Sequence, residues 1–276
     1  MIKLTYETAC FETYPTTIVI ACFNCAHALK FSLPKLKNNT AGQYELLVML
    51  DTTEDDSLSI IKSIPFDCIR VFTSQTPLFE ARAESFLMSK SHASKYIISV
   101  QPDQLIHERA WNEKMSSPLI LYPDVFSVSA RCCHSLHGGN YIGRCNRNVF
   151  SPLDRRVINN ERLFHIRDTC NRGPLLFHAK RLRELNFYDW RNFYMDNSDH
   201  DLHCRAHAFD WKTGLYQIDF HAPSELRTVG HDIMNARVSL ENRKVIRDLA
   251  KNVTKSTCFH RTRGLNIGET RRIIGP

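Results

Sequence analysis

Short apolar runs rich in β-branched residues alternate with helical patterns through about the first hundred residues, and this alternation constrains the fold most. The runs expected to form buried strands are 17–22, 44–50, 68–72 and 96–100. The helices expected between them are 27–36, 57–63 and 80–91. Strands separated by single helices form a mostly parallel sheet with helices on both faces. The sequence therefore predicts an α/β fold.

The second half of the chain has weaker periodicity but continues the same fold. Strands are expected at 125–130, 175–177 and 215–220, and helices at 179–185 and 199–209. The stretch 131–169, rich in Arg, Asn, His and Gly, is expected to be a long functional loop. We therefore predict a single Rossmann-like domain over residues 1–226, with a mostly parallel central sheet flanked by helices, and a basic, partly helical C-terminal extension over 227–276.

Polar residues follow several predicted strands at the points where those strands end. They are Phe23-Asn24, Asp51-Thr52 and Gln101-Pro102-Asp103. Parallel strands place their carboxyl ends at one edge of the sheet, where ligands of such folds bind. Carboxylates at that edge suit a divalent cation that bridges a diphosphate, because Mg²⁺ and Mn²⁺ favour oxygen ligands. Asp199 opens a predicted helix, where a carboxylate is also a good N-terminal cap.

The net charge of +7 is located at the carboxyl end of the chain. Residues 1–226 hold 25 basic and 25 acidic side chains, whereas the last 50 residues hold 11 basic and 4 acidic ones. Aromatic-interleaved basic repeats and nucleic-acid motifs are absent, so no nucleic-acid partner is expected. The basic tail is a candidate for peripheral contact with an anionic membrane or with a second copy of the chain.

The apolar residues are spread too evenly for a membrane span. No run approaches the roughly 18 apolar residues that a membrane helix needs, and residues 1–7 lack the apolar stretch of a signal peptide. A cytoplasmic protein without a transmembrane anchor is therefore expected, and its ten cysteines are expected to be reduced thiols. The absence of a glycine-rich phosphate loop argues against a kinase or a dehydrogenase.

Six segments along about residues 15–225 carry a resemblance to a known family. They are TIVIACFN at 17–24, LVMLDTTED at 47–55, ARAE at 81–84, YIISVQPD at 96–103, NRGPLLF at 171–177 and DNSDHDLHCR at 196–205. In order and spacing they resemble the motifs of the family 2 glycosyltransferases. The resemblance implies the GT-A fold, with a nucleotide-binding half over about 15–104 and an acceptor half over about 105–226.

The resemblance implies an inverting transfer of a sugar from a UDP-, GDP- or dTDP-sugar donor to a hydroxyl of a glycan or other acceptor. Asp199 corresponds to the family's general base. Asp103 corresponds to the metal motif, where Mn²⁺ or Mg²⁺ is expected, with His221 as a second candidate ligand. The residues expected to bind the nucleotide sugar are Ala21, Phe23, Asn24, Asp51, Arg82, Gln101 and Asp103. Those expected to meet the acceptor are Arg172, Trp190 and Asp201.

Three positions depart from the family's pattern. Gln101 replaces the first acid of the metal motif, Ala83 stands where Asn is frequent, and Ser198 precedes the base where the family has Glu. A neutral carbonyl attracts a cation less than a carboxylate does, so weaker or diphosphate-dependent metal binding is expected. The departures leave an alternative open, namely a non-catalytic protein that holds a nucleotide or a glycan on the same fold. Trp190 also has a second interpretation, as a core packing residue.

Overall fold

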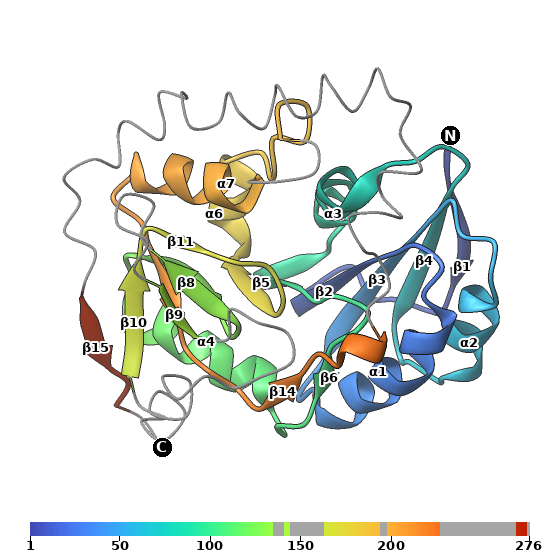
Figure 1. Ribbon diagram of the computed structural model, residues 1–276, viewed down its shortest axis with the longest axis horizontal. Helices are drawn as coiled ribbons and strands as arrows, with labels where there is room; N and C mark the ends of the chain where they lie inside the picture. The colour runs from blue at the N-terminus through green and yellow to red at the C-terminus, as the bar shows by residue number, and fades with distance from the viewer. Residues whose placement is uncertain (135–140, 144–162, 194–197, 227–268, 275–276) are drawn as a thin grey trace.

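The computed structural model describes residues 1–134, 141–143, 163–193, 198–226 and 269–274 (Figure 1). Its centre is a ten-stranded sheet with the strand order β1-β4-β3-β2-β5-β12-β7-β13-β10-β15. A three-stranded sheet, β11-β8-β9, and a two-stranded sheet, β14-β6, lie beside it.

The elements follow one another as strands and helices in near alternation through the first half. The strands are β1 (Ile2–Glu7), β2 (Tyr14–Cys22), β3 (Tyr44–Asp51), β4 (Ile69–Ser74), β5 (Ala93–Ser99), β6 (Leu105–Ile106), β7 (Val125–Ser129), β8 (Cys132–His134), β9 (Tyr141–Gly143), β10 (Leu163–Arg167), β11 (Thr169–Cys170), β12 (Leu175–His178), β13 (Lys212–Leu215), β14 (Phe220–His221) and β15 (Thr270–Arg272). The helices are α1 (Ala26–Asn39), α2 (Ser57–Ser63), α3 (Phe79–Ser89), α4 (Trp111–Leu121), α6 (Ala179–Glu184) and α7 (Ser198–His207), with a 3₁₀ turn at Ser224–Leu226.

The prediction of a mostly parallel central sheet is confirmed. β4, β3, β2 and β5 pair in parallel, and β7 pairs in parallel with β13. β12 runs antiparallel between β5 and β7, so β7 again points the same way as β5. Only β1, β12 and β10 run against the other strands of the ten-stranded sheet, which is therefore a mostly parallel sheet in an α/β fold.

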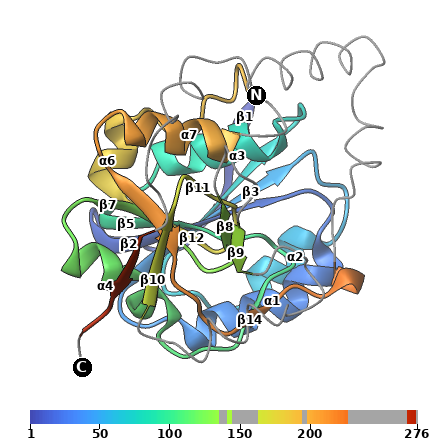
Figure 2. The ribbon, with the colours of Figure 1, turned by 60° about the vertical axis from the view of Figure 1, so that its left-hand side comes forward.

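Helices cover both faces of the sheet, as Figures 1 and 2 show. α1, α2 and α4 lie on one face, where Leu29 and Leu33 of α1 pack with Trp111 of α4 in one apolar cluster. α3, α6 and α7 lie on the other face, and Leu87 of α3 and Leu202 of α7 belong to the second cluster. Each helix buries one apolar stripe against the sheet and turns its polar face away from the core.

Two expectations for the second half were wrong in part. The stretch 131–169 is not a continuous loop, because β8, β9, β10 and the start of β11 lie within it; residues 135–140 and 144–162 fall outside the described part of the chain. These strands pair with segments far along the sequence, since β10 bonds to β13 on one side and to β15 on the other. Weak local periodicity is the expected result for such short strands.

The expected strand 215–220 is also interrupted. β13 ends at Leu215, and β14 begins at Phe220 in a different sheet. Between them the backbone turns to the loop after β6, where the carbonyl of Asp219 accepts the N–H groups of His107 and Glu108 at 2.9 and 3.1 Å. The apolar residues of this stretch are buried, although its backbone does not form one continuous strand.

The end of the basic tail joins the sheet. β15 pairs with β10, and Ile273 is buried in the first apolar cluster. Arg271 donates to both carboxylate oxygens of Asp124, at 2.6 and 2.8 Å, a bidentate geometry that fixes the strand at the sheet edge. Residues 227–268 of the expected partly helical extension lie outside the described residues.

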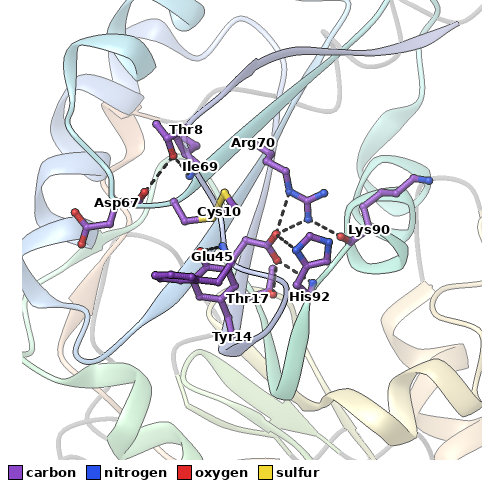
Figure 3. Close-up of a disulfide and its surroundings, with 12 residues drawn as sticks. Thr8, Cys10, Tyr14, Thr17, Glu45, Asp67, Ile69, Arg70, Lys90 and His92 are labelled. Carbon is purple, nitrogen blue, oxygen red and sulfur yellow. Dashed lines mark hydrogen bonds and ion pairs between the residues drawn. A yellow bond between two sulfur atoms is a disulfide. The ribbon is translucent and has the colours of Figure 1, made fainter.

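The expectation that all cysteines are reduced was wrong for one pair. Cys10 and Cys68 form a disulfide, with their Cα atoms 5.2 Å apart (Figure 3). The reason is the antiparallel pairing of β1 with β4, which continues beyond Glu7 and Arg70 to the Thr8 N–H and the Ile69 carbonyl, 3.0 Å apart. Among the described residues, Cys22, Cys25, Cys133 and Cys170 are buried thiols outside any disulfide.

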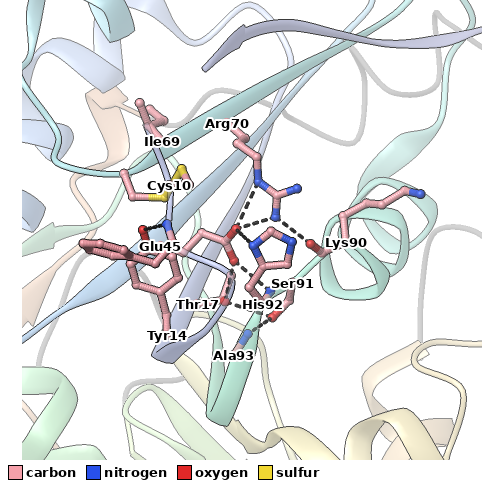
Figure 4. A network of polar contacts seen from close by, with 12 residues as sticks. Cys10, Tyr14, Thr17, Glu45, Ile69, Arg70, Lys90, Ser91, His92 and Ala93 are labelled. Atoms are coloured by element: carbon pink, nitrogen blue, oxygen red, sulfur yellow. Dashed lines mark hydrogen bonds and ion pairs between the residues drawn. A yellow bond between two sulfur atoms is a disulfide. The ribbon is translucent and has the colours of Figure 1, made fainter. Parts of the chain in front are cut away.

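A buried carboxylate ties the strands together at the edge where the parallel strands begin (Figure 4). The Glu45 side chain has no exposed surface, and it accepts from Thr17 Oγ1 at 2.8 Å and from the His92 N–H at 3.0 Å. Arg70 donates to its other oxygen from Nε at 3.0 Å and also from Nη2. The network links β2, β3, β4 and the start of β5 at the end of the sheet opposite to the predicted ligand edge.

None of the helices in the described part of the chain combines the length and the apolar character that crossing a bilayer requires.

Candidate functional site

The loops after β2 and β3 are bound to each other at the carboxyl edge of the sheet. Asn24 Oδ1 accepts the Glu54 N–H at 2.9 Å, and Asp55 Oδ2 accepts the Ala26 N–H at 2.8 Å. Asn24 and Thr52 have positive φ values of 49° and 50°, a conformation that Asn tolerates better than most residues. The predicted nucleotide-binding residue Asn24 thus lies in a fixed turn beside the acidic loop.

Two further residues predicted to bind the nucleotide sugar lie at the end of β2 and just after it. Ala21 and Phe23 are partly buried, and Ala21 is in register with Met49 of β3. The Phe23 N–H donates to the Cys25 sulfur at 3.1 Å, where α1 begins.

Asp51 joins the end of β3 to the start of α3. Its carboxylate accepts the N–H groups of Leu78 and Phe79, each at 2.9 Å, and only 4% of the residue is exposed. A carboxylate at this place satisfies backbone donors that a helix start leaves without an intrahelical partner. Asp51 therefore positions α3 at the ligand edge, and its contact with a nucleotide base stays a prediction.

Gln101 also contacts α3, at Glu80 in the first turn of the helix. Its Nε2 donates to Glu80 Oε1 at 3.0 Å, and its Oε1 lies 3.5 Å from the Gln104 Nε2 donor. The amide is thus oriented by protein partners on both sides. Asp103 is almost fully buried, with 1% exposure, immediately before β6.

The expected metal ligands come from adjacent strands but do not form a cluster. His221 of β14 pairs with Leu105 of β6, which follows Asp103 by two residues. His221 is exposed, whereas Asp103 is buried. Within the described residues, no three or more His, Cys, Asp or Glu side chains are arranged to hold a metal ion. These side chains therefore do not fit a metal site made by the protein alone.

Arg82 and Trp190, one predicted for the donor and one for the acceptor, are in contact. The Arg82 guanidinium lies 4.5 Å from the centroid of the Trp190 ring, and Arg191 lies 5.2 Å from the same ring. Such cation–π pairs contribute about 0.5–1 kcal/mol at exposed sites. Trp190 also packs against the second apolar cluster, so both of its sequence interpretations are compatible with this position.

Asp199 lies in the first turn of α7, where its Oδ1 accepts the His200 N–H at 3.0 Å. Burial acts to raise the pKa of Asp199, but the electrostatic effects of His200, Arg172 and His203, together with the hydrogen bond from the His200 N–H, outweigh it and hold the pKa below its ordinary value. Asp199 is therefore ionised at neutral pH, the state that can accept a proton.

Asp201, two residues further on, has a structural partner. It forms an ion pair of 2.8 Å with Arg205 on the same helix face, and Arg205 also donates to the carbonyls of Leu185 and Phe187. Burial raises the pKa of Asp201 despite this pairing. The pair ties α7 to the end of α6, and acceptor binding by Asp201 stays a prediction.

Arg172 connects the ligand edge with α7. It is 7% exposed and donates from Nη1 to Glu80 Oε2 at 2.7 Å and from Nη2 to Ser198 Oγ. Its Nε lies 3.6 Å from Glu84 Oε2. Since Glu80 also binds Gln101, one continuous network runs from the end of β5 through α3 to the residue before Asp199. We call Gln101, Glu80, Glu84, Arg172 and Ser198 the Arg172 network.

Glu80 and Glu84 are members of this network that the sequence interpretation missed. They are four residues apart on α3, so they lie on one face of the helix. Two acids at this spacing repel each other unless a cation lies between them. That spacing, inside a helix with many buried residues, was the available signal that a distant arginine or lysine packs here.

Solved structures of other proteins share this fold at low sequence identity. TarS from S. aureus matches with a TM-score of 0.55 and 11% identity over 88% of this chain, which spans 40% of TarS. The mannosyltransferase PcManGT from Pyrobaculum calidifontis, in complex with GDP-Man and Mn²⁺, matches with a TM-score of 0.56 and 14% identity over 85% of this chain and 64% of its own. GalNAc-T7 with UDP, GalNAc and Mn²⁺ has a TM-score of 0.57 and 11% identity over 91% of this chain and 58% of its own.

The sequence itself gives a more direct assignment. No curated protein matches the chain significantly. The profile of the family described as Glycosyl transferase family 2 matches residues 17–178, which include the turn at Asn24, the α3 segment and Arg172. This match covers more than half of the chain. The protein therefore belongs to glycosyl transferase family 2.

Proposed function

We propose that this protein is an inverting glycosyltransferase in which Asp199 is the general base. The carboxylate accepts the proton of an acceptor hydroxyl while the hydroxyl oxygen bonds to the anomeric carbon of the donor sugar. The bond from that carbon to the diphosphate oxygen breaks on the opposite face, and the nucleoside diphosphate leaves with the electron pair. The observation that carries the proposal is the Arg172 network, which connects Gln101 at the predicted donor edge with Ser198 beside Asp199.

The donor is proposed to bind at the carboxyl edge of β2, β3 and β5. Asn24, Asp51 and Gln101 follow these strands, and two of the solved structures similar to this chain hold GDP-Man in one case and UDP in the other. Arg82 is the proposed cation for the leaving diphosphate, because it is partly exposed in α3. Asp103 and His221 remain the predicted metal ligands, and no catalytic step is assigned to a metal here.

The acceptor is proposed to approach α7 from the side of Trp190. An aromatic ring provides a flat apolar surface on which a sugar ring can stack, and Trp190 is only partly buried beneath Arg82 and Arg191. We retain the cytoplasm as the proposed location, and contact of the basic tail with a membrane or a second copy as a proposal.

Calorimetric titration with UDP, GDP, dTDP and CMP, each with and without Mn²⁺, tests the donor site. We expect one nucleoside diphosphate to bind and CMP not to bind, because the leaving group of the proposed reaction carries two phosphates. Binding that requires Mn²⁺ would support the predicted metal. Binding that is equally tight without Mn²⁺ would remove the metal from the proposal and assign the diphosphate to Arg82 and its neighbours. Absence of binding to any nucleotide would contradict the glycosyltransferase proposal.

The second candidate is a nucleotide- or glycan-binding protein without turnover. The observation in its favour concerns Gln101. Its amide is neutral and contributes no negative charge to a cation at this edge, and it is bound by Glu80 and Gln104. This candidate predicts that the nucleotide found by titration binds, but that no release of nucleoside diphosphate from the matching sugar donor is detected with any acceptor.

A further inference from the structure

The arginine at the centre of the Arg172 network lies away from solvent and is held on several sides. Besides Glu80, Glu84 and Ser198, its guanidinium lies over the Tyr188 ring, 4.7 Å from the centroid. An arginine that is 7% exposed and bound by two carboxylates has little of its side chain left for a substrate. Acceptor binding by Arg172 stays a prediction.

The turn that carries Arg172 is fixed from the donor side. Gly173 follows it with a φ of +70°, and a Cβ atom at this glycine would lie 2.2 Å from Gln104 Nε2. Gln104 in turn accepts the Gln101 N–H at 3.0 Å. The backbone therefore approaches the Gln101 loop as closely as only glycine allows, which places the Arg172 side chain between α3 and α7.

We propose that Arg172 is a positioning residue for Asp199, and that Glu80 and Glu84 of α3 hold its guanidinium in place. Arg172 acts through Ser198, which it fixes at the start of α7, and through its positive charge beside the Asp199 carboxylate. The proposal rests on the proposed function for the role of Asp199. It adds Glu80, Glu84 and Arg172 to the site as residues that act through Asp199.

The charges around Asp199 are consistent with this assignment. His200 and His203 face it from its own helix, Arg172 from the turn before β12, and Glu84 and Tyr188 from the neighbouring elements. Burial raises the pKa of Glu84 to about 7, while Arg172 acts to lower it and Glu80 acts to raise it further. Arg172 thus compensates negative charge from both α3 and α7, and its loss leaves carboxylates facing one another.

The test measures the pKa of Asp199 directly in the full-length protein. Aspartate labelled with ¹³C at Cγ is incorporated, and the Asp199 resonance is identified as the signal absent from Asp199→Asn. In Arg172→Met we expect the Asp199 pKa to rise by about one unit or more, because an opposite charge at close range shifts a carboxylate by about 1–3 units. In Arg172→Lys, which keeps the charge, we expect a much smaller rise. An unchanged Asp199 pKa in folded Arg172→Met would overturn the proposal.

Glu80→Gln keeps the proposal testable where Arg172→Met does not fold. This variant removes the carboxylate that pairs with Arg172 Nη1 at 2.7 Å, so the Arg172 charge acts more strongly on Asp199 and the Asp199 pKa is expected to fall. A rise or no change would overturn the proposal. Because the titration needs no turnover, its outcome is independent of whether sugar transfer is found. Loss of transfer in Asp199→Asn and the pKa response to Arg172 are thus separate results, and either can fail alone.

Discussion

Replacement of Asp199 by asparagine is expected to reduce sugar transfer by about 100- to 10,000-fold, the usual contribution of a general base. The change removes the proton acceptor but keeps the size of the side chain. Asp199 lies in the first turn of α7, and the predicted nucleotide-binding residues come from the ends of β2, β3 and β5. We therefore expect the affinity for the nucleoside diphosphate to remain nearly unchanged.

The measurement is release of nucleoside diphosphate from the donor selected by calorimetry, in the presence of a panel of glycan acceptors. Asp210→Asn is the matched control, because Asp210 is exposed after the end of α7 and its φ of 58° suits asparagine. The control is expected to keep full activity. If Asp199→Asn retains more than about a tenth of the transfer rate, the assignment of the general base is wrong.

Replacement of Glu45 by alanine is expected to lower the free energy of unfolding by about 3–5 kcal/mol, the usual cost of removing one partner of a buried ion pair. Glu45 is fully buried and Arg70 retains only 12% side-chain exposure. Without the carboxylate, the Arg70 guanidinium, the Thr17 hydroxyl and the His92 N–H lose their shared acceptor. The strands that begin at this edge then lose the contact that links them.

Urea unfolding measures this effect through the midpoint at constant m value. Glu184→Ala is the matched control, since Glu184 forms an exposed i,i+4 pair with Lys180 at 4.0 Å. The control is expected to change stability by less than about 1 kcal/mol. A similar loss of unfolding free energy in both variants would show that the buried Glu45 network stabilises the fold no more than an exposed ion pair does. Nucleotide binding by the remaining folded Glu45→Ala protein should persist, because the network lies at the opposite edge of the sheet.

Local pattern was sufficient for helices that bury one face and for strands that form one short apolar run. The helix expected at 57–63 is α2, and the strand expected at 44–50 is β3 with one further residue. Both follow from spacing within a few neighbouring residues, since one face of a helix or one short apolar run is buried. The ligand edge followed as well, because parallel strands determine where their carboxyl ends lie.

The partners of Arg172 were not predictable in this way. Glu80 precedes it by 92 residues, and Gln101 by 71. The sequence resemblance indicated only an acceptor-side role for Arg172, and the antiparallel insertion of β12 between β5 and β7 brings the turn before β12 against α3 and α7. The same is true of Cys10 and Cys68, which meet through the pairing of β1 with β4.

The sequence by itself thus determined the α/β alternation, the sheet edge that carries the predicted donor residues, and the family resemblance that the profile match confirmed. Only the tertiary structure decided that β10 and β15 extend the sheet, that Gln101 binds Glu80, and that Arg172 is buried beside Asp199. The physical reason is the range of the interactions. Apolar periodicity is written in adjacent residues, whereas ion pairs and edge strands depend on which distant segments the sheet brings together.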